Sequence, residues 1–239
     1  MVHEGETAGT APTVMGVAAT VVLLRDGAAS PEVLLLERPR HRGSFAGAWV
    51  FPGGAVDPED RDGDGDGDGD ESGLEEPGVR RAAVREVREE TGLRVTADDL
   101  VPMSCWVPPE GIPKRMRTWF FLARDPGGTL VLAPDECVDA EWMPPVEALH
   151  RHASGALTLV SPTWVTLHGL VGHCSVEEVL AAQRARLPEL FTARMRGSGA
   201  GVTVFWEGDV AFTDDARRGD AGGRHRLAIG ALPWVYERS

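Results

Sequence analysis

The 239-residue sequence predicts an α/β protein, and two kinds of pattern support this class. Near the N-terminus, β-branched and apolar segments have the composition of strands. Residues 79–91 carry apolar side chains at helical spacing and end at a glycine, which is typical of a helix and its C-cap. Further strand-like and helix-like segments follow, so we expect a mixed domain with both types of element.

The first half of the chain is expected to contain strands separated by glycine turns. Residues 1–13 are polar and are expected to form a disordered lead. Strand-like composition covers residues 14–24, 32–37 and 49–51. The first two segments are expected to pair as a hairpin around Asp26-Gly27, and the third stops at Pro52-Gly53-Gly54. Pro77 is suited to the start of the helix over 79–91.

The second half is expected to add strands and three more helices. Strand-like segments are residues 100–107, 117–123, 136–143, 202–206 and 227–229. Helix-like segments are residues 144–151, 161–173 and 175–186, the last two with serines expected as N-caps. We therefore expect a main domain over residues 14–187 and an extension over 188–239 that packs on it.

The net charge of −13 is concentrated in one segment. Residues 57–76 contain eleven acidic residues and one arginine, and therefore carry −10 of the total. Because an Asp-Gly repeat cannot bury apolar surface, the stretch from Asp57 to Gly73 is expected to be solvated. No basic stripe compensates for the acids, which argues against duplex nucleic acid as a partner.

Other classes of protein are also disfavoured. The longest apolar runs are far shorter than the roughly 20 residues that a membrane helix needs, and residues 1–13 lack the features of a signal peptide. Cys105, Cys137 and Cys174 have neither metal-knuckle nor redox spacing, so they are expected to be small hydrophobic residues. A cytoplasmic protein that does not interact with membranes is the expectation.

Three glutamates share one face of the predicted helix. Glu86, Glu89 and Glu90 stand at positions i, i+3 and i+4, where like charges cost about a few tenths of a kcal/mol per pair. A divalent cation would account for the cluster, and Mg²⁺ fits because it takes carboxylates together with waters and substrate phosphates. Arg85 is placed to pair with a carboxylate and fix its rotamer. A solvated acidic helix face is the alternative that the helix alone leaves open.

The residues around this cluster resemble the signature of a known family. The run Arg85-Glu86-Val87-Arg88-Glu89-Glu90-Thr91-Gly92-Leu93 is similar to the second half of the Nudix box, R-E-U-x-E-E-x-G-U, where U is aliphatic. Gly54 corresponds to the opening glycine of the box, and Asp60 stands where the box has a glutamate. Arg85 follows Gly54 by 31 residues instead of 14, and the surplus of 17 is the Asp-Gly insert.

The resemblance implies both a fold and a reaction. The fold would be an α/β/α sandwich around a mixed sheet, with extra C-terminal helices. Nudix proteins cleave a nucleoside diphosphate linked to another moiety. The implied function is therefore Mg²⁺-dependent hydrolysis of a diphosphate linkage by metal-activated water, with Mn²⁺ as the alternative ion. The implied partner is a small nucleotide substrate, and a homodimer is expected by analogy.

Three features are similar to the coenzyme A diphosphatase-like branch of this family. They are the insert inside the box, residues 106–123 with their two tryptophans, and the helix start at residues 161–163. Pro108 replaces a threonine that is usual in that branch. Coenzyme A or an acyl-CoA is therefore the favoured substrate. Another nucleotide, such as ADP-ribose or an oxidised nucleotide, stays open, and so does a non-catalytic ligand sensor, which the intact glutamates disfavour.

The resemblance also implies roles for individual residues. The expected metal ligands are Glu86, Glu90, Glu89 and the carbonyl of Gly54. Expected catalytic residues are Glu89 as a third ligand or general base, Glu86, Arg85 as the residue that orients the carboxylates, and Glu136. Many relatives place a late glutamate, which acts as ligand or base, where Glu136 stands. The identity of the base stays open.

Four basic residues are candidate phosphate contacts, because basic side chains, and arginine forks above all, bind phosphate oxygens. They are Arg38, Arg42, Lys114 and Arg115. For any one of them a solvated surface position is the alternative. Trp49 and Trp106 are candidates for stacking on a base, with a place in the core as the alternative.

The acidic insert also satisfies a calcium-loop pattern. Asp60, Asp62, Asp64, Gly65 and Glu71 have the spacing of an EF-hand loop. A repeat of Asp and Gly meets that pattern by composition alone, and a glycine stands where an aliphatic anchor is usual. Weak, nonspecific cation binding is therefore the favoured interpretation.

Overall fold

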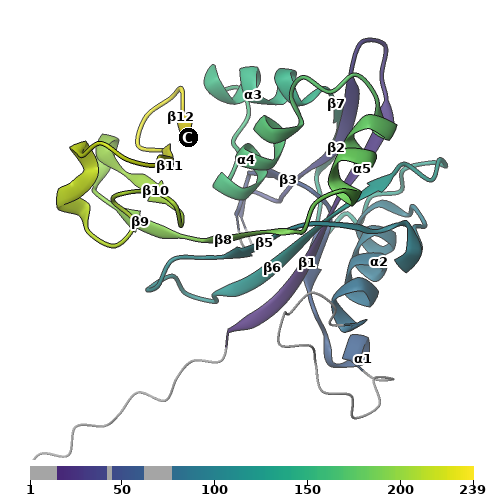
Figure 1. Cartoon of the computed structure of the whole chain (residues 1–239). Coiled ribbons are helices and arrows are strands. Elements are labelled where there is room, and N and C mark those ends of the chain that lie inside the picture. The colour runs from purple at the N-terminus through teal and green to yellow at the C-terminus, as the bar shows by residue number, and fades with distance from the viewer. Residues whose placement is uncertain (1–14, 42–44, 62–76) are drawn as a thin grey trace, which may run out of the picture.

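A computed structural model of the chain describes residues 15–41, 45–61 and 77–239. The expected lead over 1–13, Arg42 and most of the acidic insert lie outside these residues. The described part contains an eight-stranded sheet with helices on both faces, followed by a four-stranded sheet (Figure 1). The α/β class with a mixed sheet is confirmed.

The main sheet has eight strands. Six of them form one continuous order, and the other two pair with strands of that order. The strands are β1 (Gly16–Asp26), β2 (Pro31–Glu37), β3 (Trp49–Val50), β4 (Gly53–Ala55), β5 (Val101–Val107), β6 (Met116–Arg124), β7 (Asp139–Met143) and β8 (Glu189–Thr192). The order is β3-β2-β1-β6-β5-β8, with β4 paired to β1 and β7 paired to β2. β1 is parallel to β6 and β5 is parallel to β8, while the other pairs are antiparallel.

Both faces of the central strands are apolar, and this explains why helices cover the sheet twice. Side chains alternate between faces along a strand. In β1, Val21 and Leu23 pack in the cluster that contains helix α2 (Pro77–Thr91), whereas Val22 and Leu24 pack in the cluster that contains α4 (Ser161–Leu170) and α5 (Val176–Arg184). Figure 1 shows α2 and α4 on opposite sides of the sheet.

Two short helices complete the sandwich. Helix α1 (Pro58–Arg61) contacts α2, and α3 (Pro145–Ala153) contacts α4. Single 3₁₀ turns occur at η1 (Ala97–Asp99), η2 (Gly199–Gly201) and η3 (Asp215–Gly219). In the part of the chain that the structure describes, no helix has both the length and the apolar character needed to cross a membrane.

The C-terminal residues share the core of the main domain. Strands β9 (Arg194–Arg196), β10 (Thr203–Phe205), β11 (His225–Ala228) and β12 (Val235–Arg238) form an antiparallel sheet. Trp106 of β5 stacks on Phe191 of β8 with ring centroids 3.8 Å apart, and Trp206 meets Trp106 edge-on at 5.9 Å. β8 belongs to the main sheet, so the first residues of the extension expected over 188–239 form a strand of the main domain.

A buried ion pair joins the loop after β10 to strand β11 of the small sheet. The carboxylate of Asp209 accepts two hydrogen bonds of 2.7 Å from the Arg226 guanidinium, and two more from the backbone N–H groups of Ala211 and His225. The side chain of Asp209 is fully buried and that of Arg226 is 9% exposed. Although burial raises the pKa of Asp209, the bonds from Arg226 and the backbone lower it below the usual value.

Several local predictions are wrong in detail. Ser161 is the first residue of α4 and makes no capping bond, whereas Ser175 caps α5 by accepting from the backbone N–H of Glu178. Glu136 lies in a turn, because β7 begins only at Asp139. Cys174 is exposed, while the other two cysteines are buried as expected.

The prediction that the acidic segment is solvated from its first residue is also wrong. Its beginning forms α1, and Asp60 in that helix is only 5% exposed. The physical reason is the partly exposed partner Arg85, whose charge compensates for the loss of hydration of Asp60. Because the Asp60 carboxylate is paired with Arg85, it is not free to act as the first ligand of a calcium loop.

Candidate active site

Helix α2 is the element that positions the glutamates. Val79, Ala83 and Val87 on one side of the helix pack against the sheet and are at most 3% exposed. The helix ends at Thr91, and Gly92 follows with a φ of +72°, the left-handed conformation that suits a glycine C-cap. The apolar face therefore fixes the rotation of the helix, and the glutamates at its C-terminal end face the turn and strands beside it.

Three carboxylates converge at this end of α2. One oxygen each from Glu86, Glu90 and Glu136 lies within 4.8 Å of the others. Glu86 and Glu90 are buried, while Glu136 is exposed and comes from the turn before β7. The carboxylates border a cavity of about 380 Å³. It is lined by Arg38, Pro39, Gly53, Gly54, Asp57, Arg85, Glu86, Glu89, Glu90, Asp135 and Glu136.

Glu90 is the most deeply buried acid of the three, at 1% exposure. Its carboxylate accepts a hydrogen bond of 2.6 Å from Arg38 and one of 2.9 Å from the backbone N–H of Gly53. Burial raises the pKa of Glu90 to about 7, against the lowering effect of these two donors. The neighbouring carboxylates of Glu86 and Glu136 raise the pKa further, because a second negative charge nearby disfavours ionisation.

Glu86 is in close contact with Gly54 of strand β4. A Cβ on Gly54 would meet the Glu86 carboxylate, so a side chain at position 54 would displace that carboxylate. Position 53 requires glycine, since a Cβ on Gly53 would collide with the backbone carbonyl of Ala19 in β1 and its φ is +157°. Burial raises the pKa of Glu86, although Arg85 opposes the shift.

Arg85 connects the two separated halves of the motif. It donates to Asp60 at 2.8 Å, to Glu86 and Glu89 at 2.9 Å, and to the Ala55 carbonyl at 2.9 Å. The bond to Asp60 raises the pKa of Arg85 above its ordinary value, so the guanidinium stays charged. Burial raises the pKa of Asp60, but the bonds from Arg85 and the backbone lower it overall. Both side chains are therefore charged at neutral pH.

The cluster fits a divalent cation. Hard carboxylate oxygens are the ligands that Mg²⁺ and Mn²⁺ take, and Glu86, Glu90 and Glu136 present three of them within the span of one ion site. Burial is the main cause of the raised pKa values of Glu86 and Glu90, and the neighbouring carboxylates raise them further. A bound cation would compensate for the negative charge of the cluster.

The remaining sequence candidates have different places. Glu89 lines the cavity, but its side chain is 52% exposed and pairs with Arg85, outside the three-carboxylate cluster. Arg38 also lines the cavity and pairs with Glu90. Lys114 and Arg115 are absent from the described lining of this cavity, and Arg115 donates to the carbonyl of Pro108 at 2.9 Å. A role of these two residues in phosphate binding stays a prediction.

The two tryptophan candidates also differ from the glutamates in position. Trp106 is 5% exposed and packs between Phe191 and Trp206, so it belongs to the core. Trp49 in β3 is partly buried and packs against the same core cluster. Stacking on a substrate base is therefore assigned to neither of them.

Comparison with known proteins identifies the family. A protein-family model described as the NUDIX domain matches residues 14–161, more than half of the chain. The chain belongs to the Nudix family. A crystal structure of a Nudix hydrolase from Alicyclobacillus acidocaldarius is 28% identical, covers 72% of this chain and 97% of that chain, and has a TM-score of 0.60. This Nudix chain is accordingly a hydrolase that acts on pyrophosphate bonds, a class that generally uses divalent metal ions.

Two curated relatives match a smaller part of the chain. The NAD-capped RNA hydrolase NudC of Pseudomonas putida is 38% identical over 84 residues, which are 32% of this chain and 29% of the relative. The protein of the same name from Pseudomonas entomophila is 37% identical over 84 residues, with the same coverage. The chain thus aligns with less than a third of the length of either relative.

Two contacts of the Nudix site do not follow from the local sequence. Arg38 is a phosphate candidate in the sequence, and its partner in the structure is Glu90, 52 residues away. Asp60 is only an approximate match to the box, yet it is the buried partner of Arg85 across the insert. The signal that indicates Asp60 is its spacing from Gly54, which the insert leaves intact.

Proposed function

We propose that the chain hydrolyses the diphosphate linkage of a nucleoside diphosphate derivative with Mg²⁺, and that coenzyme A or an acyl-CoA is its substrate. The convergence of Glu86, Glu90 and Glu136 on one cavity is the observation that carries the reaction class. The choice of coenzyme A rests on the sequence features shared with one branch of the family, above all the insert inside the box.

In this proposal the three converging carboxylates hold the cation. A bound Mg²⁺ neutralises charge on phosphoryl oxygens and lowers the pKa of a coordinated water. Gly54 leaves room for the Glu86 carboxylate, and Arg85 fixes that carboxylate by a bond of 2.9 Å. Arg38 holds Glu90 with one N–H group, and a guanidinium has five N–H donors, so others can reach substrate phosphate.

Glu89 is assigned to proton transfer. Its side chain is half exposed at the cavity and is oriented by Arg85 at 2.9 Å. A carboxylate that accepts a single hydrogen bond keeps free lone pairs, so it can take a proton from a water molecule in the cavity. Glu136 is the alternative base, because it is exposed and lies among the ligands.

A pair of variants separates the two candidate bases. Glu89→Gln is expected to lower kcat at least about 100-fold, the low end of general-base effects, with unchanged Mg²⁺ affinity. Glu136→Gln is expected to weaken Mg²⁺ binding, measured by calorimetry, because it removes one of three converging carboxylates. Glu110→Gln, an exposed loop position outside the cavity, is the matched control. Near-normal turnover of Glu89→Gln would transfer the role of base to Glu136.

A substrate panel tests the proposal as a whole. With Mg²⁺ and mass-spectrometric detection, coenzyme A is expected to give 3′,5′-ADP and 4′-phosphopantetheine. Rapid turnover of ADP-ribose without turnover of coenzyme A would contradict the choice of substrate but keep the reaction class. If no diphosphate compound in the panel is cleaved in a metal-dependent manner, the proposed function fails.

NAD is the second candidate substrate. The similarity to two NAD-capped RNA hydrolases over 84 residues favours it, and NAD also contains a diphosphate between two nucleosides. Production of AMP and nicotinamide mononucleotide in the panel would support it. A cytoplasmic location and a homodimer stay predictions from the sequence.

A further inference from the structure

A second cavity lies on the other face of the main sheet. Its volume is about 420 Å³, which is in the range of small-molecule sites. Leu122 of β6, Val179 of α5 and Phe191 of β8 supply apolar walls, and all three belong to the core cluster opposite α2. The cavity has no lining residue in common with the cavity of the three glutamates, so the catalytic proposal leaves it unexplained.

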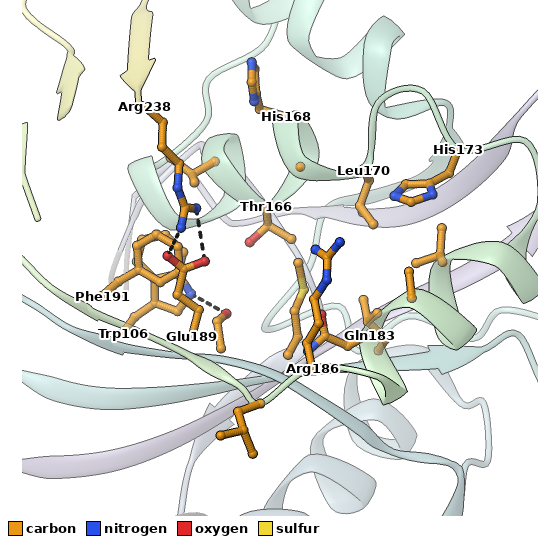
Figure 2. Close-up of a pocket in the computed structure, with 18 of the residues that line it drawn as sticks. Trp106, Thr166, His168, Leu170, His173, Gln183, Arg186, Glu189, Phe191 and Arg238 are labelled. Atoms are coloured by element: carbon orange, nitrogen blue, oxygen red, sulfur yellow. Dashed lines mark hydrogen bonds and ion pairs between the residues drawn. The ribbon is translucent and has the colours of Figure 1, made fainter. Parts of the chain in front are cut away.

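A buried hydroxyl group faces this second cavity without a partner. Thr166 of α4 is 2% exposed and lines the cavity, and its Oγ1 forms no hydrogen bond within the described part of the chain. Figure 2 shows the Thr166 side chain directed from α4 into the space above β5 and β8. Because buried polar atoms are nearly always paired, this hydroxyl is suited to a ligand atom in the cavity.

A guanidinium group without an ion pair lies across from the hydroxyl. Arg186 follows α5 and reaches toward Thr166 (Figure 2), and no described acidic side chain forms a salt bridge with it. The acid that lines the same cavity, Glu189, is paired with another arginine. Its carboxylate accepts two hydrogen bonds from Arg238 of β12, one of them at 3.1 Å. The arginine and glutamate side chains of the lining therefore sum to one net positive charge, in a chain whose net charge is −13.

We propose that this cavity binds a small amphipathic monocarboxylate. The apolar part of the ligand would lie against Leu122, Val179 and Phe191, while its carboxylate accepts hydrogen bonds from Arg186 and Thr166. A guanidinium fork matches the two oxygens of a carboxylate. A monoanion fits the single net positive charge better than a phosphate dianion, whose second charge would be repelled by Glu189. This site is additional to the proposed diphosphatase function and does not depend on it.

The full-length chain tests the ligand class directly by calorimetry and thermal unfolding. Phenylacetate and octanoate are the probes, phenylacetamide is the neutral counterpart, and phenyl phosphate is the dianionic one. Binding and a higher Tm are expected with at least one carboxylate and not with the amide. Equal binding of the amide, or tighter binding of the phosphate, would overturn the assignment, and so would the absence of binding by both carboxylates.

Variants locate the bound probe. Arg186→Gln is expected to weaken carboxylate binding about tenfold or more, as a lost charge-assisted hydrogen bond does, and Thr166→Val about threefold to tenfold. Arg184→Gln is the matched control, because Arg184 is exposed and does not line the cavity. Unchanged affinity in both of the first two variants would overturn the proposal.

A cavity-filling variant distinguishes a blocked cavity from misfolding as the cause of lost probe binding. Gly169 of α4 lines the cavity, and a Cβ at this position meets no atom within 4 Å. Gly169→Leu is therefore expected to block the probe while the Tm of the unliganded protein stays equal or rises, since leucine also favours a helix. Full binding by this variant would place the probe elsewhere. Glu86→Gln is expected to keep the carboxylate affinity, which separates this site from the diphosphatase.

Discussion

Glu86→Gln is expected to lower kcat about 1,000-fold or more and to leave the fold intact. The substitution keeps the size of a side chain that is 11% exposed, and it removes one of three converging carboxylates. Metal-based stabilisation of charge is worth several kcal/mol, and each 1.36 kcal/mol corresponds to a factor of ten in rate. The measurement is the Mg²⁺-dependent kcat for the substrate that the panel identifies.

The same variant is expected to lose activity without losing thermal stability in the absence of metal. Burial raises the pKa of Glu86, so its ionised form is disfavoured in the fold without metal at neutral pH. A neutral glutamine relieves this penalty, and the Tm without metal is expected to be equal or higher. Addition of Mg²⁺ is expected to raise the Tm of the wild-type chain more than that of the variant.

Two results would contradict the assignment of Glu86. One is near-normal turnover, and the other is an Mg²⁺-induced rise in Tm equal to that of the wild-type chain. Glu110→Gln again serves as the control, with wild-type values expected for both measurements. A lower Tm without metal would instead give Glu86 a structural role, through its 2.9 Å bond to Arg85.

The local part of the site could be predicted from the sequence because one helix carries it. Glu86 and Glu90 are four residues apart, and helical geometry brings side chains at this spacing to one face. The composition of Gly53-Gly54 predicts a break after the third strand; the structure instead places both glycines in the short strand β4, where the backbone of β1 leaves no room for a Cβ at Gly53. Both signals depend on neighbours in the sequence.

Contacts between residues far apart in the sequence cannot be predicted from local patterns. Arg38 and Glu90 lie 52 residues apart, and their bond exists because the end of β2 lies beside the end of α2 in the folded chain. Glu136 joined the site only through the family resemblance, since nothing in its local sequence distinguishes it from a surface glutamate. Lys114 and Arg115 have the right chemistry for phosphate, but neither of them lines the cavity of the glutamates.

The C-terminal region shows the same limit. Short strand-like segments were recognisable at residues 202–206 and 227–229, but their partners were not. The stack of Trp106 on Phe191 and the pair of Asp209 with Arg226 depend on tertiary packing that no periodicity reports. The fold class was therefore predictable, whereas the way in which residues 189–239 complete the second cavity was not.

Asp209→Ala is expected to destabilise the chain by about 3–5 kcal/mol, the range for breaking a buried ion pair by removing one partner. The substitution leaves the Arg226 guanidinium, whose side chain is 9% exposed, without its bidentate acceptor, and it orphans the backbone N–H of His225. Urea unfolding followed by tryptophan fluorescence measures the loss. The exposed pair of Arg217 and Asp220 is the control, where Asp220→Ala is expected to cost about 1 kcal/mol or less.

The pH dependence of this loss has a defined sign. The folded-state pKa of Asp209 lies below the unfolded value of about 3.9. The ion pair therefore contributes its full stability above the unfolded pKa, and the contribution is lost as the pH falls through the folded pKa. The difference in unfolding free energy between the wild-type chain and Asp209→Asn is expected to be constant near neutral pH and to shrink below about pH 4. A difference that grows under acid would contradict the assignment.

The double variant Asp209→Ala with Arg226→Met separates the lost pair from the orphaned charge. If most of the penalty comes from an unpaired buried cation, the double variant is expected to be more stable than Asp209→Ala alone. Equal destabilisation would mean that the backbone bonds to Asp209 dominate. Because Arg238 of the same small sheet holds Glu189 beside the second cavity, Asp209→Ala is also expected to weaken binding of the carboxylate probe, whereas Asp220→Ala is not.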